Sequence, residues 1–402
     1  MEKKDLLESV FHLKQYDFVR GEGAWLFDRE GNRYLDLNEM CVFLGQGNQH
    51  FIDRVTQALN GVTNGRSSLV RYKEQLTDYL MESTGHIFKA VHYTASGSET
   101  TEWAVRLAQK ITGRTEVVSF WNSIHGRTFL SASMSGLPKR KEHYGPIAPG
   151  IVFNPYPHCQ HCPFDKRPEN CGYFCLNFLQ QKIRYESAQD IAAVIIEPYQ
   201  GADIAYPPQG YLQRLRRWTQ ENGILLIFDE IQTGLGRSGS LYCYQKEGVE
   251  PDMLLLGKGL GNGLHISALL TKQIPQEKYL HAVTGGAGDD CIACAAACAV
   301  MEEVTQPQTL QRVRDCSELL QAELGMLQRQ GKLRHVRVYG STAAVEFTSP
   351  QIGRQVRQQM QEKRFLFGGG DNSIVIKPPL SLTVEQTRLF LDALGESLCA
   401  LL

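Results

Sequence analysis

The feature of this sequence that most constrains its fold is a set of three short apolar segments, each of which ends at a charged residue. Residues 191–196 precede Glu197, residues 224–228 precede Asp229, and residues 253–256 are followed, after one glycine, by Lys258. Segments with helical periodicity lie around them, at 99–111, 211–221 and 293–304. This alternation predicts a largely parallel sheet covered by helices, that is, an α/β fold. The charged residues then lie at the carboxyl ends of strands, where open α/β sheets bind ligands.

The pattern changes towards both ends of the chain. Residues 21–37 alternate apolar and polar residues around a turn at 28–31, which predicts a hairpin. After residue 305, a helical segment at 310–330 is followed by strand-like segments at 333–339, 343–347 and 373–377, and by a last helix from Thr383. We therefore expect an N-terminal segment (1–45) that packs with a small α+β C-terminal domain (301–402), and a large domain (46–300) between them.

Charge and hydropathy exclude several classes of partner. The 402 residues include 42 Lys and Arg against 43 Asp and Glu, and the net charge of −1 gives no support to a polyanion-binding surface. No apolar run approaches the roughly 20 residues that span a bilayer. The first ten residues, MEKKDLLESV, lack the apolar stretch of a signal peptide. We expect a cytoplasmic protein without nucleic acid or membrane partners.

A candidate anion site lies at Ser96-Gly97-Ser98-Glu99. The S-x-x-E spacing is that of a capping box, which marks the start of a helix. Free amide groups at a helix N-terminus suit a phosphate, and a glycine allows a ligand to approach the backbone. Most such sequences only cap helices, so the motif alone leaves phosphate binding open.

The motifs together match the requirements of one cofactor, pyridoxal phosphate. This cofactor needs an amine for a Schiff base, a carboxylate that keeps its pyridine nitrogen protonated, and a helix N-terminus for its phosphate. Lys258 lies between two glycines that let it turn inward, and a lysine in a partly dry crevice has a lowered pKa and acts as a nucleophile. Asp229 supplies the carboxylate and Gly97 begins the phosphate turn.

At this point the sequence resembles the class III, or ω-amino-acid-type, pyridoxal-phosphate aminotransferases of fold type I. The resemblance covers nearly the whole chain. It rests on ordered motifs: GSE (97–99), HGRT (125–128), Glu197-Pro198, DEIQTGLGRSG (229–239) and GKGLGNG (257–263). It implies a large, mostly parallel sheet domain that binds the cofactor and a smaller α+β C-terminal domain.

The resemblance also implies a role for each matching residue. Lys258 forms the internal aldimine and moves the proton at the substrate's Cα, and Asp229 pairs with the pyridine nitrogen. Ile231 packs on the ring and Gln232 hydrogen-bonds its 3-oxygen. The other implied cofactor-binding residues are Gly97, Ser98, Ile124, His125, Glu197 and Thr284. Thr284 resembles a threonine that reaches the phosphate of the neighbouring subunit, which implies a homodimer.

Departures from the family pattern concern the substrate pocket. Many members have an aromatic residue before the His-Gly-Arg segment, where this chain has Ile124; Trp121 or Phe120 are the possible substitutes. Members that use glutamate pair a Glu with an Arg that grips the α-carboxylate. Here those positions are Ala202 and Val375, so we predict that the Arg–Glu switch is absent.

Other residues are left to bind the carboxylate and to line the pocket. The candidates for binding the carboxylate are Lys377 and Arg127. The alternative interpretation of Lys377 is a solvated surface charge. The segment Asn38–Phe43 falls where relatives line the pocket, and its residues fit an apolar slot or core packing equally well.

The cysteines fall mainly in two clusters. Cys159, Cys162, Cys171 and Cys175 have the C-x2-C-x8-C-x3-C spacing of a zinc or iron–sulfur site, but a cysteine-rich surface excursion explains them too, and we assign no metal. Cys291, Cys294 and Cys298 lie among alanines and fit a tightly packed helix.

We therefore predict an aminotransferase that moves an amino group between an amine or amino acid and an oxo-acid or aldehyde. The alternative is a decarboxylase, racemase, epimerase or lyase on the same fold, since these enzymes share the motifs. A binding protein without catalysis is disfavoured because Lys258, Asp229 and Gln232 are all present.

Overall fold

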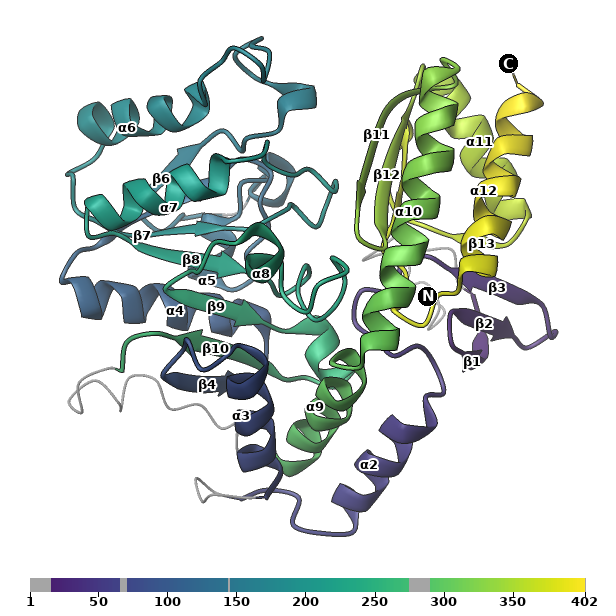
Figure 1. Cartoon of the computed structure of the whole chain (residues 1–402), viewed down its shortest axis with the longest axis horizontal. Coiled ribbons are helices and arrows are strands. Elements are labelled where there is room, and N and C mark those ends of the chain that lie inside the picture. Colours follow the sequence, from purple (N-terminus) through teal and green to yellow (C-terminus); the bar gives the residue numbers. More distant parts are fainter. Residues whose placement is uncertain (1–15, 66–70, 144, 275–289, 402) are drawn as a thin grey trace.

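The computed structural model describes residues 16–65, 71–143, 145–274 and 290–401. Its centre is a seven-stranded sheet with the order β4-β10-β9-β8-β7-β5-β6 (Figure 1). The strands are β4 (Ala90–Thr94), β5 (Glu116–Phe120), β6 (Ile151–Asn154), β7 (Ile191–Ile196), β8 (Leu225–Asp229), β9 (Met253–Leu256) and β10 (Ser267–Thr271). Strands β5 to β9 are parallel, and β10 runs antiparallel to both of its neighbours. The predicted α/β class is confirmed.

Both faces of this sheet are covered, which explains why its strands are apolar without alternation. In β8, Leu225 and Ile227 pack with helix α4 (Gly97–Thr112), whereas Leu226 and Phe228 belong to the core on the opposite face. That second core includes residues of α3 (Arg71–Ser83), α6 (Phe174–Glu186), α7 (Tyr211–Glu221) and α9 (Cys291–Val304). The three cysteines of α9 are buried, as expected for small residues in a tightly packed helix.

The C-terminal part has its own core. An antiparallel sheet, β11 (Leu333–Tyr339)-β12 (Thr342–Phe347)-β14 (Ser373–Ile376), packs with α10 (Pro307–Arg329), α11 (Pro350–Glu362) and α12 (Val384–Cys399) (Figure 1). The N-terminal strands β1 (Phe18–Glu22), β2 (Trp25–Asp28) and β3 (Arg33–Asp36) join the two-residue β13 (Phe365–Leu366) in a second sheet. Leu35 and Leu37 share the core of the C-terminal helices. We keep the limits 1–45, 46–300 and 301–402 as our proposal for the domains.

Shorter elements connect these layers. They are α2 (Gln49–Leu59), α5 (Phe129–Met134), α8 (Cys243–Glu247) and the 3-10 helices η1 (Pro138–Arg140), η2 (Cys159–His161) and η3 (Lys258–Gly261). Strand β10 and helices α2, α3, α6 and α11 were not predicted from the sequence.

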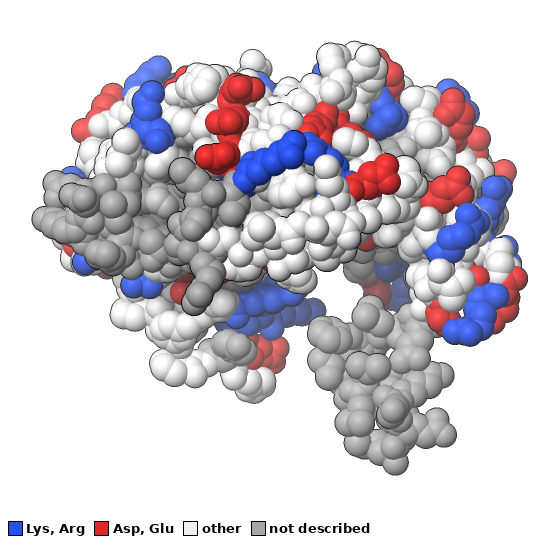
Figure 2. All heavy atoms as spheres, turned by 90° about the horizontal axis from the view of Figure 1, so that it is seen from below, with Lys and Arg blue, Asp and Glu red and all other residues white. Residues whose placement is uncertain are grey.

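Two surface properties bear on the partners of the chain. Over the described ranges, no helix combines the length and apolar character that crossing a membrane requires. On the face shown in Figure 2, basic and acidic side chains are interspersed. This distribution agrees with the net charge of −1 and offers no broad basic surface there.

Two helical glycines test how tightly the C-terminal part is packed. A Cβ at Gly353 in α11 would lie 2.2 Å from the backbone oxygen of Asp371, whereas one at Gly395 in α12 would meet open space. We expect Gly353→Ala to lower the free energy of unfolding by about 1–3 kcal/mol through overpacking. The matched control Gly395→Ala should raise it by about 0.4–1 kcal/mol, because alanine restricts the unfolded chain. Urea unfolding followed by circular dichroism measures both, and equal effects would contradict the packing around α11.

Candidate active site

The three predicted charged residues meet at the carboxyl edge of the large sheet. Asp229 ends β8, Glu197 follows β7, and Lys258 follows β9 at the start of η3. Lys258 has a left-handed backbone conformation, with φ of 45°, which a non-glycine residue rarely adopts. Its Nζ donates a hydrogen bond to Gln232 Oε1, and Gln232 Nε2 donates to the Gly201 carbonyl at 2.6 Å. The sharp turn after β9 therefore aims the amine across the end of β8.

Asp229 is held by two contacts. His125 Nδ1 lies 2.7 Å from Asp229 Oδ2, and both side chains are almost fully buried. The Ile231 amide donates to Asp229 Oδ1 at 3.1 Å. Each carboxylate oxygen can accept two hydrogen bonds. The contacts therefore fix the orientation of the carboxylate and leave it capacity for a further donor.

Glu197 organises the chain on the other side of His125. Its two carboxylate oxygens accept hydrogen bonds from the Ile124 amide and the Gly201 amide, each at 2.9 Å. Burial raises the pKa of Glu197, and the charge of Asp229 acts in the same direction, while His125 and the two amides oppose the shift. Glu197 thus fixes the backbone at Ile124 and Gly201.

The start of α4 presents backbone amides that precede its intrahelical hydrogen bonds. Ser96 caps the helix by accepting from the Glu99 amide at 3.2 Å, and the amides of Gly97 and Ser98 precede the first intrahelical bond. The predicted capping box is incomplete, because Glu99 Oε2 accepts from the Ala95 amide at 3.0 Å. A Cβ on Gly97 would lie 2.9 Å from Ile231 Cδ1, so only glycine brings the helix start this close to Ile231.

The charge on Lys258 is sensitive to its surroundings. Loss of water lowers its pKa below the usual value for lysine, while Glu197 and Asp229 favour the charged form. A lowered pKa leaves more of the amine neutral at neutral pH, and the neutral amine is the nucleophile.

The aromatic substitutes considered for Ile124 differ in their burial. Phe120 is fully buried and packs edge-to-face on Tyr156, with ring centroids 6.1 Å apart. Trp121 is 43% exposed. Ile124, which is partly buried, remains the residue that Glu197 positions beside His125.

The carboxylate candidates differ in their surroundings. Lys377 is only 9% exposed, so it is not a solvated surface charge. Burial first, and then the neighbouring charges of Lys258 and Arg237, lower the pKa of Lys377 to about 8. In contrast, Arg127 is exposed in this chain, and its backbone amide donates to Ser98 Oγ at 3.0 Å. Val375 packs in a small apolar cluster with residues such as Tyr199 and Tyr339.

Sequence reasoning assigned no role to Arg237, which is fully buried. Its guanidinium lies 4.1 Å above the ring of Phe43 and donates to the Pro378 carbonyl at 2.7 Å, next to Lys377. The sequence feature that could have identified Arg237 is its position within the glycine-rich signature 229–239.

Residues of the segment Asn38–Phe43 differ in whether they pack in the core or lie near the candidate pocket. Phe43 belongs to the core, where a Cβ on Gly259 would strike its ring. Met40 Sδ lies 4.0 Å from Lys377 Nζ. Cys41 is partly buried, and burial raises the pKa of its thiol together with the charge of Glu39, while Lys258 and Arg237 oppose the shift. Phe43 is therefore packing, while Met40 and Cys41 lie beside the cationic groups.

Two further predictions fall elsewhere. Thr284 lies outside the described residues. Cys159, Cys162, Cys171 and Cys175 line one small cavity of about 30 Å³ beside η2 and α6. Within the described part of the chain, these cysteines are not part of a group of three or more side chains placed to hold a metal ion.

Comparisons with known proteins agree with this geometry. A family model described as aminotransferase class-III matches residues 9–398. The chain is 33% identical to the acetylornithine aminotransferase of Gloeobacter violaceus (93% of this chain, 92% of the relative) and 31% identical to that of Streptococcus mutans (92% of each).

Solved structures give the same result. An amine transaminase from an uncultivated Pseudomonas species, in its PLP-bound form, is 26% identical with a TM-score of 0.89 and covers 98% of this chain and 96% of that one. An engineered ω-transaminase from Pseudomonas jessenii, at 24% identity, shares the fold with a TM-score of 0.90, covering 98% and 94%. The chain therefore belongs to the class III aminotransferases, which transfer amino groups with pyridoxal phosphate as cofactor.

Proposed function

We propose that this aminotransferase acts on an amine or amino acid whose acidic group is bound by Lys377. The observation that carries the proposal is the burial of Lys377, which is only 9% exposed. Burial first, and then the charges of Lys258 and Arg237, lower its pKa, while Asp203 and Glu197 oppose the shift. Among the described residues, Lys377 Nζ has no ion-pair partner and only a weak contact with Met40 Sδ. A buried cation without a partner is costly, and an anionic substrate group offsets that cost.

The residues at the edge of the sheet fit pyridoxal phosphate. The free amides of Gly97 and Ser98 suit its phosphate, Ile231 and Ile124 suit the two ring faces, and Lys258 suits the aldehyde carbon. When bound, the cofactor supplies an electron-withdrawing ring that stabilises negative charge at the substrate's Cα.

The chain's own residues have separate tasks in the reaction. Asp229, oriented by His125, keeps a proton on the ring nitrogen. Gln232, held by Gly201, orients Lys258 Nζ and also suits the 3-oxygen of the ring. Lys258 Nζ, which Gln232 orients, would be the base that removes the proton from the substrate's Cα.

The proposed substrate choice rests on charged residues that differ from those of many relatives. Ala202 and Val375 remove the arginine and glutamate with which many relatives grip an α-carboxylate, and Val375 packs against Tyr199 and Tyr339 instead. Lys377, which lies two residues after Val375, supplies a cation in place of that arginine. The relatives in Gloeobacter violaceus and Streptococcus mutans are named for acetylornithine, and an acylated diamino acid is therefore one candidate for the test panel.

We also propose a cytoplasmic homodimer. The support for the homodimer is the resemblance of Thr284 to a threonine that reaches the partner's phosphate. Size-exclusion chromatography with light scattering tests the dimer.

Replacement of Lys258 by alanine should lower kcat by about 10³-fold or more, because the base at Cα is lost. Single-turnover formation of pyridoxamine phosphate, followed by absorbance, measures the step. Lys272→Ala is the matched control, since Lys272 forms an exposed pair with Glu250 at 2.6 Å. Turnover of the Lys258 variant at the parent's rate would contradict the proposal. Loss of carbon dioxide or racemisation without pyridoxamine phosphate would favour a decarboxylase or racemase.

Replacement of Lys377 by methionine should raise KM for a carboxylate-bearing substrate by about tenfold or more, the typical worth of a hydrogen bond to a charged group. KM for the amine analogue that lacks the carboxylate should not change. Lys272→Met is the control for a lost lysine. An equal rise for both substrates would show that Lys377 serves packing, and a selective rise in Arg127→Met alone would assign the role to Arg127.

The same lysine predicts a pH dependence. Lys377 is charged below its pKa of about 8, so the carboxylate site is intact below that pH and is lost as the pH rises through it. We expect the ratio of kcat/KM for the carboxylate substrate to kcat/KM for its amine analogue to fall above pH 8. Lys377→Arg should hold the ratio constant to higher pH, because arginine stays protonated. A ratio that does not change between pH 7 and 9.5 would contradict this assignment.

A further inference from the structure

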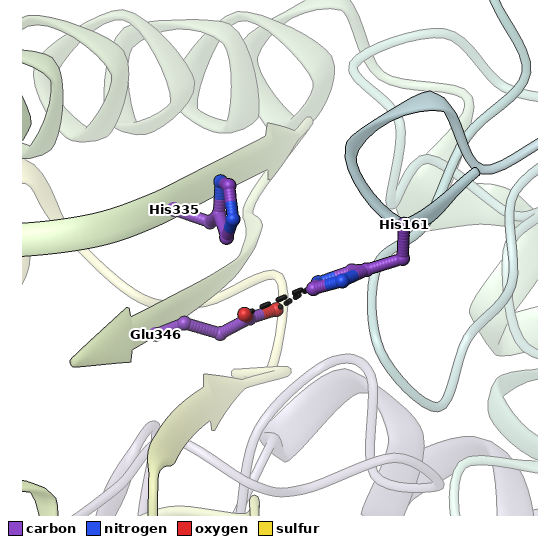
Figure 3. Close-up of side chains that lie close together, drawn as sticks. All are labelled: His161, His335 and Glu346. Atoms are coloured by element: carbon purple, nitrogen blue, oxygen red, sulfur yellow. Dashed lines mark hydrogen bonds and ion pairs between the residues drawn. The ribbon is translucent and has the colours of Figure 1, made fainter. Parts of the chain in front are cut away.

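Three potential metal ligands meet away from the active site, between the cysteine-rich excursion and the C-terminal sheet. His335 on β11 and Glu346 on β12 are directly paired across the two strands, which places their side chains on one face. His161 comes from η2, more than 170 residues earlier in the chain. Figure 3 shows the three side chains directed into one space between the loop and the strands.

The distances suit a small dication. His161 Nε2 lies 3.0 Å and 3.1 Å from the two oxygens of Glu346, and one ligand atom from each of the three residues lies within 4.8 Å of the others. Zinc binds imidazole nitrogen and carboxylate oxygen at roughly 2.0–2.2 Å, which places tetrahedral ligand atoms about 3.4 Å apart. The three groups therefore need only small side-chain rotations to coordinate an ion.

Arg337 fixes the carboxylate without occupying all of it. Its Nη1 donates to Glu346 Oε1 at 2.6 Å and to Gln160 Oε1 at 3.1 Å, and its Nε donates to the Asp203 carbonyl at 2.9 Å. Glu346 Oε2 is left for a metal. Carboxylates that ligate a metal are commonly hydrogen-bonded by residues outside the ligand set, and Arg337 donates such a hydrogen bond here. The guanidinium charge also repels a dication, which weakens binding without blocking the ligand atoms.

We propose that His161, His335 and Glu346 form a binding site for zinc or a similar first-row transition metal ion. Two imidazoles and one carboxylate are a ligand set of zinc, whereas magnesium and calcium prefer oxygen ligands alone. The His161 side chain is 46% exposed, so water has access to the fourth position.

Such an ion joins two parts of the chain that are distant in sequence. The loop already contacts the sheet through Gln160, whose Nε2 donates to the Val336 carbonyl at 3.1 Å. A metal bound to His161 and to both strands would add a second link between the loop and the sheet. An ion that binds only the folded arrangement also stabilises it.

The test is zinc titration of the holoenzyme by isothermal calorimetry after treatment with chelator, with magnesium as the comparison ion. We expect one zinc per chain in the wild type, and an affinity at least about tenfold weaker in His335→Gln and in His161→Gln. The matched control is His50→Gln. His50 also contacts a carboxylate beside an arginine, Glu302 at 2.7 Å, but no metal-ligand triad is described there.

The outcomes separate the possible sites. Equal zinc affinity in the wild type and both histidine variants, each shown to be folded by circular dichroism, would overturn the proposal. Zinc binding lost only in Cys159→Ser/Cys162→Ser would assign the ion to the thiols and would also overturn it. Magnesium binding as tight as zinc would exclude this ligand set. A zinc-dependent rise in Tm that is absent from His335→Gln and present in His50→Gln would support it.

Discussion

The contact between His125 and Asp229 is the interaction around which the active site is arranged. It joins a loop after β5 to the end of β8 in a nearly dry environment, where a carboxylate without partners would be costly. Glu197 extends the arrangement by holding the amides of Ile124 and Gly201. Gly201 in turn holds Gln232, and Gln232 contacts Lys258. One connected network therefore sets the positions of the acid, the ring-facing residue and the amine.

The positively charged residues at the proposed substrate side differ from those of many relatives. Lys377 and Arg237 are buried beside one another, and Arg237 is oriented by the ring of Phe43 and the Pro378 carbonyl. Val375 and Ala202 are apolar in place of the usual ion pair. A lysine has a single ammonium and a pKa that burial can shift, whereas arginine stays charged. The proposed carboxylate binding through Lys377 would therefore link substrate choice to pH.

The metal site that we propose beside the cysteine-rich excursion does not use its cysteines. Their spacing fits a thiolate site or a surface excursion, and the thiols line a small cavity, whereas the His161 side chain points from the loop towards β11 and β12. The histidine lies between two of the cysteines in the sequence, yet its partners are His335 and Glu346. A local motif could not identify them, because the pairing depends on how the loop docks on a distant sheet.

The sequence alone determined the α/β class, the helices and strands with strong periodicity, and the placement of Glu197, Asp229 and Lys258 after apolar strands. These follow from local hydrophobic patterns and from the rule that parallel strands end at one edge. Strand β10 was not predicted, and its antiparallel direction is defined only by its pairing with β4 and β9. Only the tertiary structure brought His125 to Asp229, buried Arg237 and Lys377 beside Lys258, and joined His161 to His335 and Glu346. Such contacts join residues far apart in the chain, and their geometry and desolvation exist only once the layers have packed.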